Sequence, residues 1–430
     1  MDIIIIGAGA SGLMAAKLLT EAGLKVTVLE ARNRIGGRIH TIQTGEENYE
    51  AGAEFIHGKL PLTLKLLKKA GLRKKSLDGE TWQLIRGQWK RSEDFEEGID
   101  EVIAQMNRLE NDVSIADFFE QYFYEEKYTS LRKSLISYIE GYYAADSRRC
   151  STKSFAEEFE SEDEDTFRPV GGYGQLINFL ENEIKLSGGE IILSTIVKEI
   201  KWEKNKVEVR DENNTRFTAA KALLTIPIGI WAANDNETGA ISYIPALTEK
   251  KEAAKKLGFG AVIKIIFCFK EAISNTEIFT RSEAKNWQHL LYAITDEAVN
   301  TWWTQHPDNS PLLTGWIAGP QAEKLKEANE EAIFQLALQA LSRILTINET
   351  ELQQQLKWWK VHNWTADPFT RGAYSYSTLH TDSARKIMVK PVENTLFFAG
   401  EGLYKGTEMG TVEAALKSGQ KAARQILKTI

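Results

Sequence analysis

The first thirty residues contain the feature that most constrains the fold. Ile3–Ile6 form a continuous apolar run, as expected for a parallel strand covered on both faces, and lead directly into Gly7-Ala8-Gly9-Ala10-Ser11-Gly12. In such a turn the first glycine permits the tight bend, the second lets the backbone approach a pyrophosphate, and the third lets the next helix pack on the strand. The pattern predicts a helix over 11–22 and a strand over 25–29, which ends at Glu30, where an acid accepts hydrogen bonds from a ribose. We therefore predict an α/β protein whose Rossmann-type domain binds a dinucleotide.

Composition and charge argue against several other classes. The 430 residues include 53 basic and 60 acidic side chains, and the formal net charge of −7 argues against a nucleic-acid partner. The two cysteines, Cys150 and Cys268, cannot build a disulfide framework or a metal cluster, so we expect no metal. No apolar run approaches the roughly 20 residues of a membrane span. We expect a cytoplasmic monomer or homodimer with no membrane partner.

Elsewhere the two kinds of periodicity interleave along the chain. Apolar spacing predicts helices over 60–69, 115–124, 175–186, 250–256, 321–345 and 411–427, and strands over 191–193, 196–202, 206–210, 221–225, 261–269 and 395–399. Because neither kind of pattern is confined to one part of the chain, we expect domains that are discontinuous in sequence.

An acidic run occupies residues 157–165. Such runs are usually solvated loops. A funnel that attracts cationic substrates is the alternative, and the sequence leaves both interpretations open.

A second glycine motif follows Glu30. Arg32-Asn33-Arg34-Ile35-Gly36-Gly37-Arg38 places three guanidinium groups around a Gly-Gly turn. Arginine makes charge-assisted contacts to phosphate, and paired glycines permit close approach of the backbone to a flat ring. The motif resembles the one that follows the first βαβ unit in the flavin-dependent amine oxidase family.

The resemblance to flavin-dependent amine oxidases, of the monoamine oxidase and polyamine oxidase type, covers nearly the whole chain. Each further motif is weak alone, but their order is specific to the family. The matching segments are 50–58, Gly171–Gly174, Leu224–Gly229, Trp364–Ser375, Phe397–Glu401 and Gly410–Ala415.

The resemblance implies an FAD cofactor and its binding residues. It implies a Rossmann-type FAD-binding domain over 1–75, 190–245 and 385–430, and a mixed α+β substrate domain over 76–189 and 246–384. Ala373 stands where covalently flavinylated monoamine oxidases carry cysteine, so the FAD is expected to be non-covalent. The implied contacts to the cofactor are Gly7, Gly9, Ala10, Ser11, Gly12, Glu30, Ala31, Arg32, Gly36, Gly37, Arg38, Gly52, Ala53, Glu54, Phe55, Val197, Trp364, Gly400, Glu401, Gly410, Thr411, Val412 and Ala415.

Lys264 is the most unusual residue of the predicted strand over 261–269. An unpaired ammonium among apolar side chains is costly, so Lys264 either lies at a strand end and extends to solvent or faces a functional polar cavity. Leu257–Gly260 followed by Lys264 is similar to the family segment whose lysine holds a water against the flavin N5. The resemblance implies that Lys264 positions this water for imine hydrolysis and assists flavin reoxidation.

Other residues are candidates for binding the substrate. Tyr374 matches the family's aromatic cage, which guides an amine to the flavin, whereas we expect Tyr376 to belong to the core. At the second cage position the sequence departs from the family, because it offers Thr407 and Glu408 with Tyr404 nearby. His57 either hydrogen-bonds an amine nitrogen or is structural. Glu54 and Glu408 are candidate anionic anchors for a distal ammonium.

The resemblance therefore implies that the protein oxidises a small primary or secondary amine to an imine and then an aldehyde, with O2 reduced to H2O2. An L-amino-acid oxidase is the first competing function, but it needs an arginine for the substrate carboxylate, and Arg371 is the obvious candidate. Two more function classes stay open: a desaturase-type FAD oxidoreductase of the same fold, and a protein-binding demethylase or interaction module.

Overall fold

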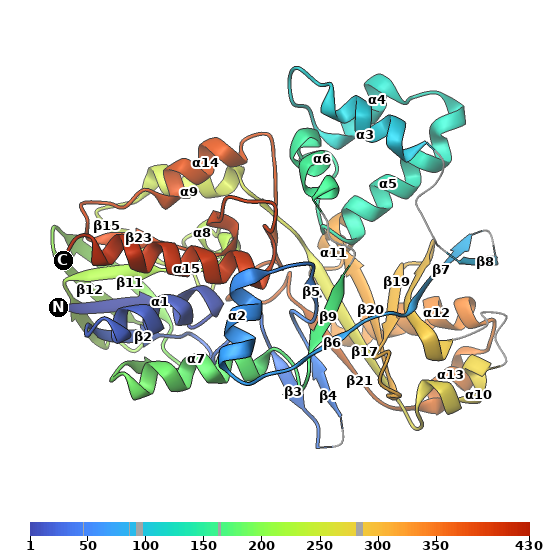
Figure 1. Ribbon diagram of the computed structural model, residues 1–430, viewed down its shortest axis with the longest axis horizontal. Coiled ribbons are helices and arrows are strands. Elements are labelled where there is room, and N and C mark those ends of the chain that lie inside the picture. Colours follow the sequence, from blue (N-terminus) through green and yellow to red (C-terminus); the bar gives the residue numbers. More distant parts are fainter. Residues whose placement is uncertain (46, 86, 92–97, 162–164, 281–286) are drawn as a thin grey trace. The chain divides into compact units, whose positions relative to one another are not determined.

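The computed structural model describes residues 1–430 except 46, 86, 92–97, 162–164 and 281–286 (Figure 1). The chain forms two compact units, each assembled from separate segments. Unit 1 comprises 1–75, 149–259 and 367–430, and unit 2 comprises 76–148 and 260–366. Which domain holds the cofactor and which holds the substrate stays a prediction.

Unit 1 contains a parallel five-stranded sheet, which confirms the predicted α/β class. The strand order is β10 (Glu190–Ile192), β2 (Lys25–Leu29), β1 (Asp2–Ile6), β14 (Lys221–Leu224) and β23 (Leu396–Phe398). Because side chains alternate along a strand, Ile3 and Ile5 enter one buried cluster, and Ile4 and Ile6 enter another. The continuous apolar run of β1 is therefore explained by cover on both faces.

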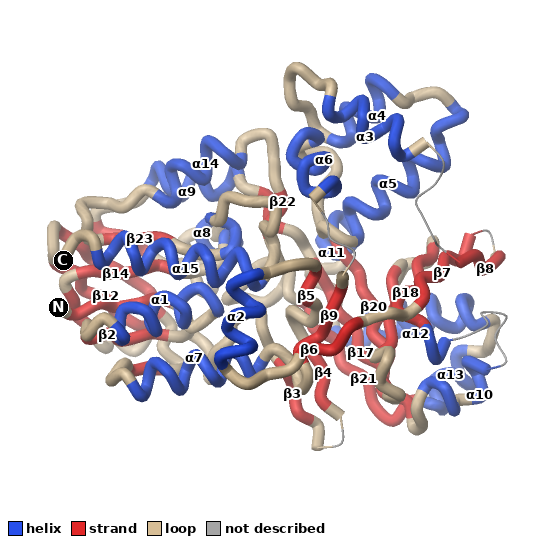
Figure 2. Tube along the Cα trace, viewed as in Figure 1, coloured by secondary structure: helices blue, strands red, loops and turns tan. Residues whose placement is uncertain are grey.

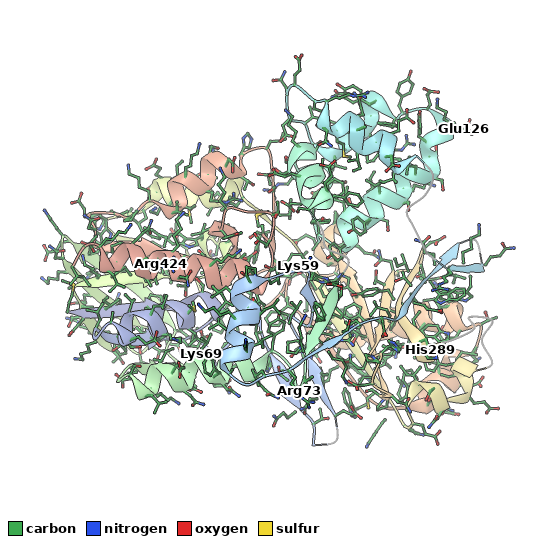
Figure 3. The ribbon with its side chains drawn as sticks, viewed as in Figure 1. Lys59, Lys69, Arg73, Glu126, His289 and Arg424 are labelled. Carbon is green, nitrogen blue, oxygen red and sulfur yellow. The ribbon has the colours of Figure 1, made fainter. Side chains whose placement is uncertain are left out.

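Helices cover the face of the sheet that carries Ile3 and Ile5 (Figure 2). They are α1 (Ala10–Glu21), α2 (Pro61–Lys69), α7 (Gly174–Leu186) and α15 (Val412–Leu427). Lys69 of α2 lies beside α7, where it forms an ion pair with Glu183 at 2.5 Å (Figure 3). α1 and α15 begin within one residue of the starts that the sequence predicts.

The opposite face of the sheet is covered by a second layer. Its four-stranded sheet has the order β13 (Arg216–Ala219), β12 (Lys206–Asp211), β11 (Val197–Glu203) and β15 (Ser242–Ile244). The sequence pattern predicted neither β13 nor β15. Three helices complete the layer: α8 (Ile228–Trp231), α9 (Thr248–Lys256) and α14 (Thr381–Val389).

A buried lysine joins α9 to α14. The Lys250 ammonium donates to the carbonyl oxygens of Ile387, Met388 and Lys390 at 2.8–3.0 Å, which satisfies the C-terminal end of α14. Segments 246–259 and 367–384, which were expected in the substrate domain, lie in unit 1, as does segment 149–189, which contains α7.

Short strands connect the remaining segments of unit 1. β3 (Thr41–Gln43) pairs with β4 (Asn48–Glu50), β5 (Ile56–His57) with β9 (Thr166–Pro169), and β16 (Gly258–Phe259) with β22 (Ser375–Tyr376); β6 (Lys74–Ser76) lies on the other side of β9.

The first half of the acidic run is helical. α6 (Thr152–Glu160) contains Glu157–Glu160, so the loop interpretation is wrong for these residues, and 162–164 lie outside the described residues. Ser151 caps the helix, and Phe155 and Ala156 are buried. Burial of these apolar residues therefore fixes the helix despite its charge.

Unit 2 is built on a mixed seven-stranded sheet. Its order is β21 (Leu356–Asn363), β17 (Val262–Phe269), β20 (Leu312–Ala318), β19 (Thr301–Thr304), β18 (Leu290–Thr295), β7 (Glu80–Ile85) and β8 (Gln88–Arg91). α12 (Glu330–Leu345) covers one face, where Phe334 stacks on Trp359 at 4.3 Å between ring centroids. The other helices are α3 (Ile99–Asn107), α4 (Ile115–Tyr122), α5 (Thr129–Gly141), α10 (Glu277–Thr280), α11 (Gly319–Lys324) and α13 (Glu349–Gln355).

Glu413 joins α15 to α2 and generates a stability prediction. Its fully buried carboxylate accepts the backbone N–H groups of Leu62 and Thr63 at 2.9 and 2.7 Å, and the Thr63 hydroxyl at 2.7 Å. Glu413→Gln turns one acceptor oxygen into a donor that faces these donors. We expect a loss of about 2–3 kcal/mol in the free energy of unfolding, measured by denaturant titration. The exposed Glu330→Gln, also in a first helical turn, is the control and should cost less than about 1 kcal/mol; equal losses would contradict the assigned role.

Candidate active site

The first glycine turn has the shape that a pyrophosphate requires. Gly7 has φ +103°, and a Cβ on Gly12 would lie 2.0 Å from the Gly7 carbonyl oxygen, so only glycine fits at position 12. A Cβ on Gly9, in contrast, would meet no atom within 4 Å. α1 has no side-chain cap at its first turn, and the buried Ser11 Oγ has no hydrogen-bond partner. Uncapped N–H groups and an unsatisfied hydroxyl beside open space fit an anionic group of a dinucleotide.

Glu30 holds this turn in place. Its buried carboxylate accepts the N–H groups of Ala8 at 2.8 Å and Arg32 at 2.9 Å. The Glu30 backbone also bonds to Ile192 and Thr195, which places the segment before Val197 beside it. A carboxylate has about four lone-pair sites, so two remain for the ribose that the sequence analysis assigned to Glu30.

The structure brings the second glycine turn onto the first. The Gly36 N–H donates to the Ala8 carbonyl at 2.8 Å, and a Cβ on Gly37 would lie 3.3 Å from the Gly9 Cα. Both residues have positive φ angles, which favour glycine. The two motifs therefore form one surface, as their predicted common ligand requires.

The arginines of the second motif have partners within the protein. Arg32 pairs with Asp367 at 2.5 Å and donates to the Thr370 hydroxyl at 2.8 Å. Burial lowers the pKa of Arg34 to about 10, with a further contribution from the neighbouring Arg32 charge. Arg32, predicted to contact phosphate, instead has Asp367 and Thr370 as partners, which the sequence pattern did not predict.

Arg38 joins two distant segments. It forms an ion pair with the buried Glu401 at 3.0 Å and donates to the Ala373 carbonyl at 2.5 Å. The other Glu401 oxygen accepts the Ser375 N–H at 2.5 Å. Tyr374 is therefore held between two anchored residues.

The 50–58 segment runs beside Arg38. The Ala53 N–H donates to the Arg38 carbonyl at 3.1 Å, which places Gly52 and Ala53 next to the second glycine motif. Glu50 accepts the Tyr173 N–H and the Thr41 hydroxyl, each at 2.7 Å. Glu50 thereby ties the 50–58 segment to the Gly171–Gly174 entry into α7.

Glu54 is paired and His57 is neutral. The buried Glu54 carboxylate forms an ion pair with Arg168 at 2.9 Å, and the Arg168 guanidinium lies 4.9 Å from the centroid of the Phe55 ring. The Glu54 charge is therefore already compensated, which its predicted role as an anionic anchor did not anticipate. Burial lowers the pKa of His57 to about 4, so its imidazole is neutral at pH 7. A neutral imidazole can donate a hydrogen bond from one ring nitrogen and accept one at the other.

Tyr374 lies against the start of α15. A Cβ on Gly410 would lie 3.3 Å from Cδ2 of the Tyr374 ring, and the Thr411 hydroxyl caps the helix that contains Val412 and Ala415. Burial raises the pKa of Tyr374 above its ordinary range, so the phenol stays protonated. Tyr376 is buried at 4% exposure, as expected for a core residue.

The departure from the family pattern at 404–408 forms a polar cluster. Glu408 accepts the Tyr404 hydroxyl and pairs with Lys417, both at 2.7 Å. Burial acts to raise the pKa of Glu408, but hydrogen bonds from Lys417 and Tyr404 outweigh it and lower the pKa. Glu408, like Glu54, is a carboxylate with a compensating cation.

Lys264 lies deep in unit 2. It is 1% exposed in β17, opposite Trp316 on β20 and His362 on β21. Its ammonium lies 5.3 Å from the centroid of the Trp303 ring. The interpretation as a solvent-reaching strand end is therefore wrong, because the whole of β17 is buried. The backbone N–H of Trp364 donates to the Val262 carbonyl at 3.1 Å, so Trp364 is anchored to the same strand.

In the part of the chain that the structure describes, no group of three or more histidine, cysteine, aspartate or glutamate side chains is arranged to hold a metal ion.

Comparisons with known proteins identify the family and the fold. The model of the family described as flavin-containing amine oxidoreductase matches residues 10–81 and 96–427. The chain is 27% identical to polyamine oxidase 4 of Oryza sativa subsp. japonica, with 100% of this chain and 89% of the rice protein covered. The structure of a putrescine oxidase bound to putrescine superimposes with a TM-score of 0.79 at 20% identity, with 99% of both chains covered. The cyclohexylamine oxidase of Brevibacterium oxydans gives a TM-score of 0.78 at 19% identity, with 100% of this chain and 99% of that chain covered.

Two glycine substitutions separate folding from cofactor binding. Gly9→Ala adds a methyl group into open space at a backbone φ of −76°, which alanine adopts readily, so the melting temperature of the apoprotein should not change. The methyl group should instead occupy space that the dinucleotide needs, and FAD affinity should fall by at least about tenfold, measured by flavin fluorescence titration. Gly12→Ala should lower both the melting temperature and the affinity, because its Cβ meets the Gly7 carbonyl. Unchanged FAD binding by Gly9→Ala would contradict the placement of the pyrophosphate.

Proposed function

The chain belongs to the family of flavin-containing amine oxidoreductases, and on this basis we propose that it oxidises a small primary or secondary amine with O2. The overall reaction converts the amine, O2 and water into an aldehyde, H2O2 and ammonia or a smaller amine. Bound FAD supplies the two-electron redox chemistry. The protein's residues bind and orient the amine, exclude solvent and control the water that hydrolyses the imine.

The FAD site rests on the two glycine turns of unit 1. The N-terminus of α1, with the Ser11 hydroxyl, would hold the pyrophosphate, and Glu30 would accept hydrogen bonds from the adenosine ribose. Gly36 and Gly37 would let the backbone approach the cofactor closely. Ala373 carries no nucleophile, so the FAD is held without a covalent bond.

Lys264 is the observation that carries the proposal. Lys264 is 1% exposed in a strand whose residues are all buried, and burial of an ammonium costs free energy that a functional role would explain. The ammonium of a lysine is a hydrogen-bond donor, so Lys264 would orient a water molecule for attack on the imine carbon. His57, held neutral by burial, would exchange a hydrogen bond with the amine nitrogen, and Tyr374 would present an aromatic wall to the substrate.

The placement of Arg371 argues against an L-amino-acid oxidase. Its guanidinium pairs with Glu237 at 2.7 Å and donates to the Thr238 carbonyl at 3.1 Å. A substrate carboxylate would have to displace both partners. Arg371, the candidate for binding a substrate carboxylate, therefore already binds two groups of the protein. This favours an amine over an L-amino acid as the substrate.

No described helix is long and apolar enough to cross a bilayer. We propose a cytoplasmic enzyme, and its proposed small-molecule partners are the amine and O2. The rice relative is named a polyamine oxidase, and the superimposed putrescine oxidase holds putrescine. Aliphatic diamines and polyamines are therefore the first substrates to test.

Anaerobic mixing of the yellow holoenzyme with amines tests the proposed reaction. We expect diamines, polyamines or aryl-alkyl monoamines to bleach the flavin absorbance near 450 nm, and admission of air to restore it with one H2O2 released per turnover. Bleaching by L-amino acids alone would instead support the amino-acid oxidase. If none of these compounds bleaches the flavin, the proposal of amine oxidation is contradicted, and a desaturase-type function becomes the better explanation.

Lys264→Met tests the role of the buried lysine. The variant should bind FAD normally but lose about 100-fold or more in the oxidative half-reaction or in turnover, because the water is no longer held. Lys221→Met is the matched control, since Lys221 is also 1% exposed but donates to the Asn394 carbonyl at 2.6 Å within the parallel sheet. The control should lose stability without losing activity per bound flavin. Unchanged kinetics in Lys264→Met would contradict the assigned role.

A further inference from the structure

Two segments of unit 1 carry a concentration of positive charge that the proposed reaction does not use. Residues 59–75 contain seven basic residues, no acidic residue and no aromatic residue. Residues 411–430 contain four basic residues and one acidic residue, the buried Glu413, and again no aromatic residue. The chain as a whole carries a net charge of −7, so this charge is strongly segregated.

The fold places these two segments together. α2 and α15 pack against each other, and Glu413 of α15 accepts the first backbone N–H groups of α2. Figure 3 shows Lys69 on α2 and Arg424 on α15. Tertiary structure therefore joins two basic segments that are more than 300 residues apart in sequence.

In each segment, helical periodicity places the exposed basic side chains on one side of the helix. Lys65 and Lys68 are exposed on α2, while Leu66 and Leu67 face the core. Lys421 and Arg424 are exposed on α15, and Lys428 is exposed at its C-cap in helical backbone conformation; the spacings of three and four residues place all three on one face. We call these five residues the basic surface. Arg73 and Lys74, also exposed, extend it beyond the end of α2.

We propose that the basic surface docks the enzyme on a membrane that contains anionic phospholipids. Four of its five residues are lysines, which act as flexible point charges, whereas specific nucleic-acid binding favours arginine forks and aromatic rings that stack on bases. Neither segment contains an aromatic residue. Leucine side chains can enter the headgroup region, and Leu427, which is 37% exposed, is next to Lys428 in the sequence.

The contact is peripheral and does not require a spanning segment. Each lysine near an anionic bilayer adds a favourable increment, and the sum falls off within a Debye length, so the attraction depends steeply on ionic strength. The acidic remainder of the chain would be repelled by the same bilayer, which orients the enzyme with α2 and α15 toward the lipid. The expectation of no membrane partner rested on the missing span and does not address this surface.

Vesicle co-sedimentation of the FAD-loaded enzyme tests the proposal. At 50 mM NaCl we expect binding to phosphatidylcholine vesicles that contain 30% phosphatidylserine, and at least about tenfold weaker binding to pure phosphatidylcholine. Addition of salt to 500 mM should release the enzyme. The charge-reversal variant K65E/K68E/K421E/R424E should lose about 100-fold or more in affinity for the anionic vesicles.

A matched variant controls for net charge alone. It reverses four exposed lysines of unit 1 that lie outside the basic surface: Lys25, Lys204, Lys256 and Lys386. It should keep most of the binding. Equal loss in both variants, or equal binding to neutral and anionic vesicles, would overturn the proposal, as would tighter binding to a fluorescent single-stranded oligonucleotide than to the anionic vesicles.

Amine oxidation separates this proposal from the proposed function. None of the reversed residues belongs to the predicted cofactor or substrate site, so both variants should bleach and reoxidise the flavin as the unmodified enzyme does. Lipid binding without amine oxidation would refute the proposed function alone, and oxidation without lipid binding would refute the docking surface alone.

Discussion

The ion pair between Arg38 and Glu401 is the contact that ties together the segments of the candidate site in unit 1. The two residues are 363 positions apart, and each also binds the 373–375 segment through a backbone hydrogen bond. Loss of Arg38 would leave the buried Glu401 carboxylate without its cation, which costs about 3–5 kcal/mol. This ion pair therefore links the second glycine motif to the segment that contains Tyr374, whose ring lies beside Gly410 at the start of α15.

Charge compensation extends from this pair across unit 1. Arg32 is paired with Asp367, Glu54 with Arg168, and Glu408 with Lys417. Burial of an isolated charge is far more costly than burial of a hydrogen-bonded pair, so a folded chain satisfies such groups internally. A ligand of this unit consequently meets a preorganised set of dipoles and paired charges.

Local sequence rules predicted the first βαβ unit well and the charge partners poorly. The positions of β1, α1, β2 and Glu30 follow from side-chain alternation and from glycines whose backbone angles or close contacts admit no side chain. The partners of Arg38 and Glu54 could not be predicted, because pairing across more than 100 residues is fixed by tertiary packing. α6 was not predicted because its run of acidic residues is typical of a solvated loop. The Ser151 cap and the buried Phe155 nevertheless stabilise a helix there.

The protonation states of unit 1 bear on which form of an amine reacts. An ammonium holds its nitrogen lone pair in an N–H bond, so it must lose that proton before a C=N bond can form. His57 is kept neutral by burial, and the charges of Glu54 and Glu408 are already compensated. These residues therefore offer little to retain the cationic form over the neutral one. Attraction of the cation can instead come from the net negative charge of the whole chain, so that capture of the ammonium and binding of the reactive neutral amine rest on different residues.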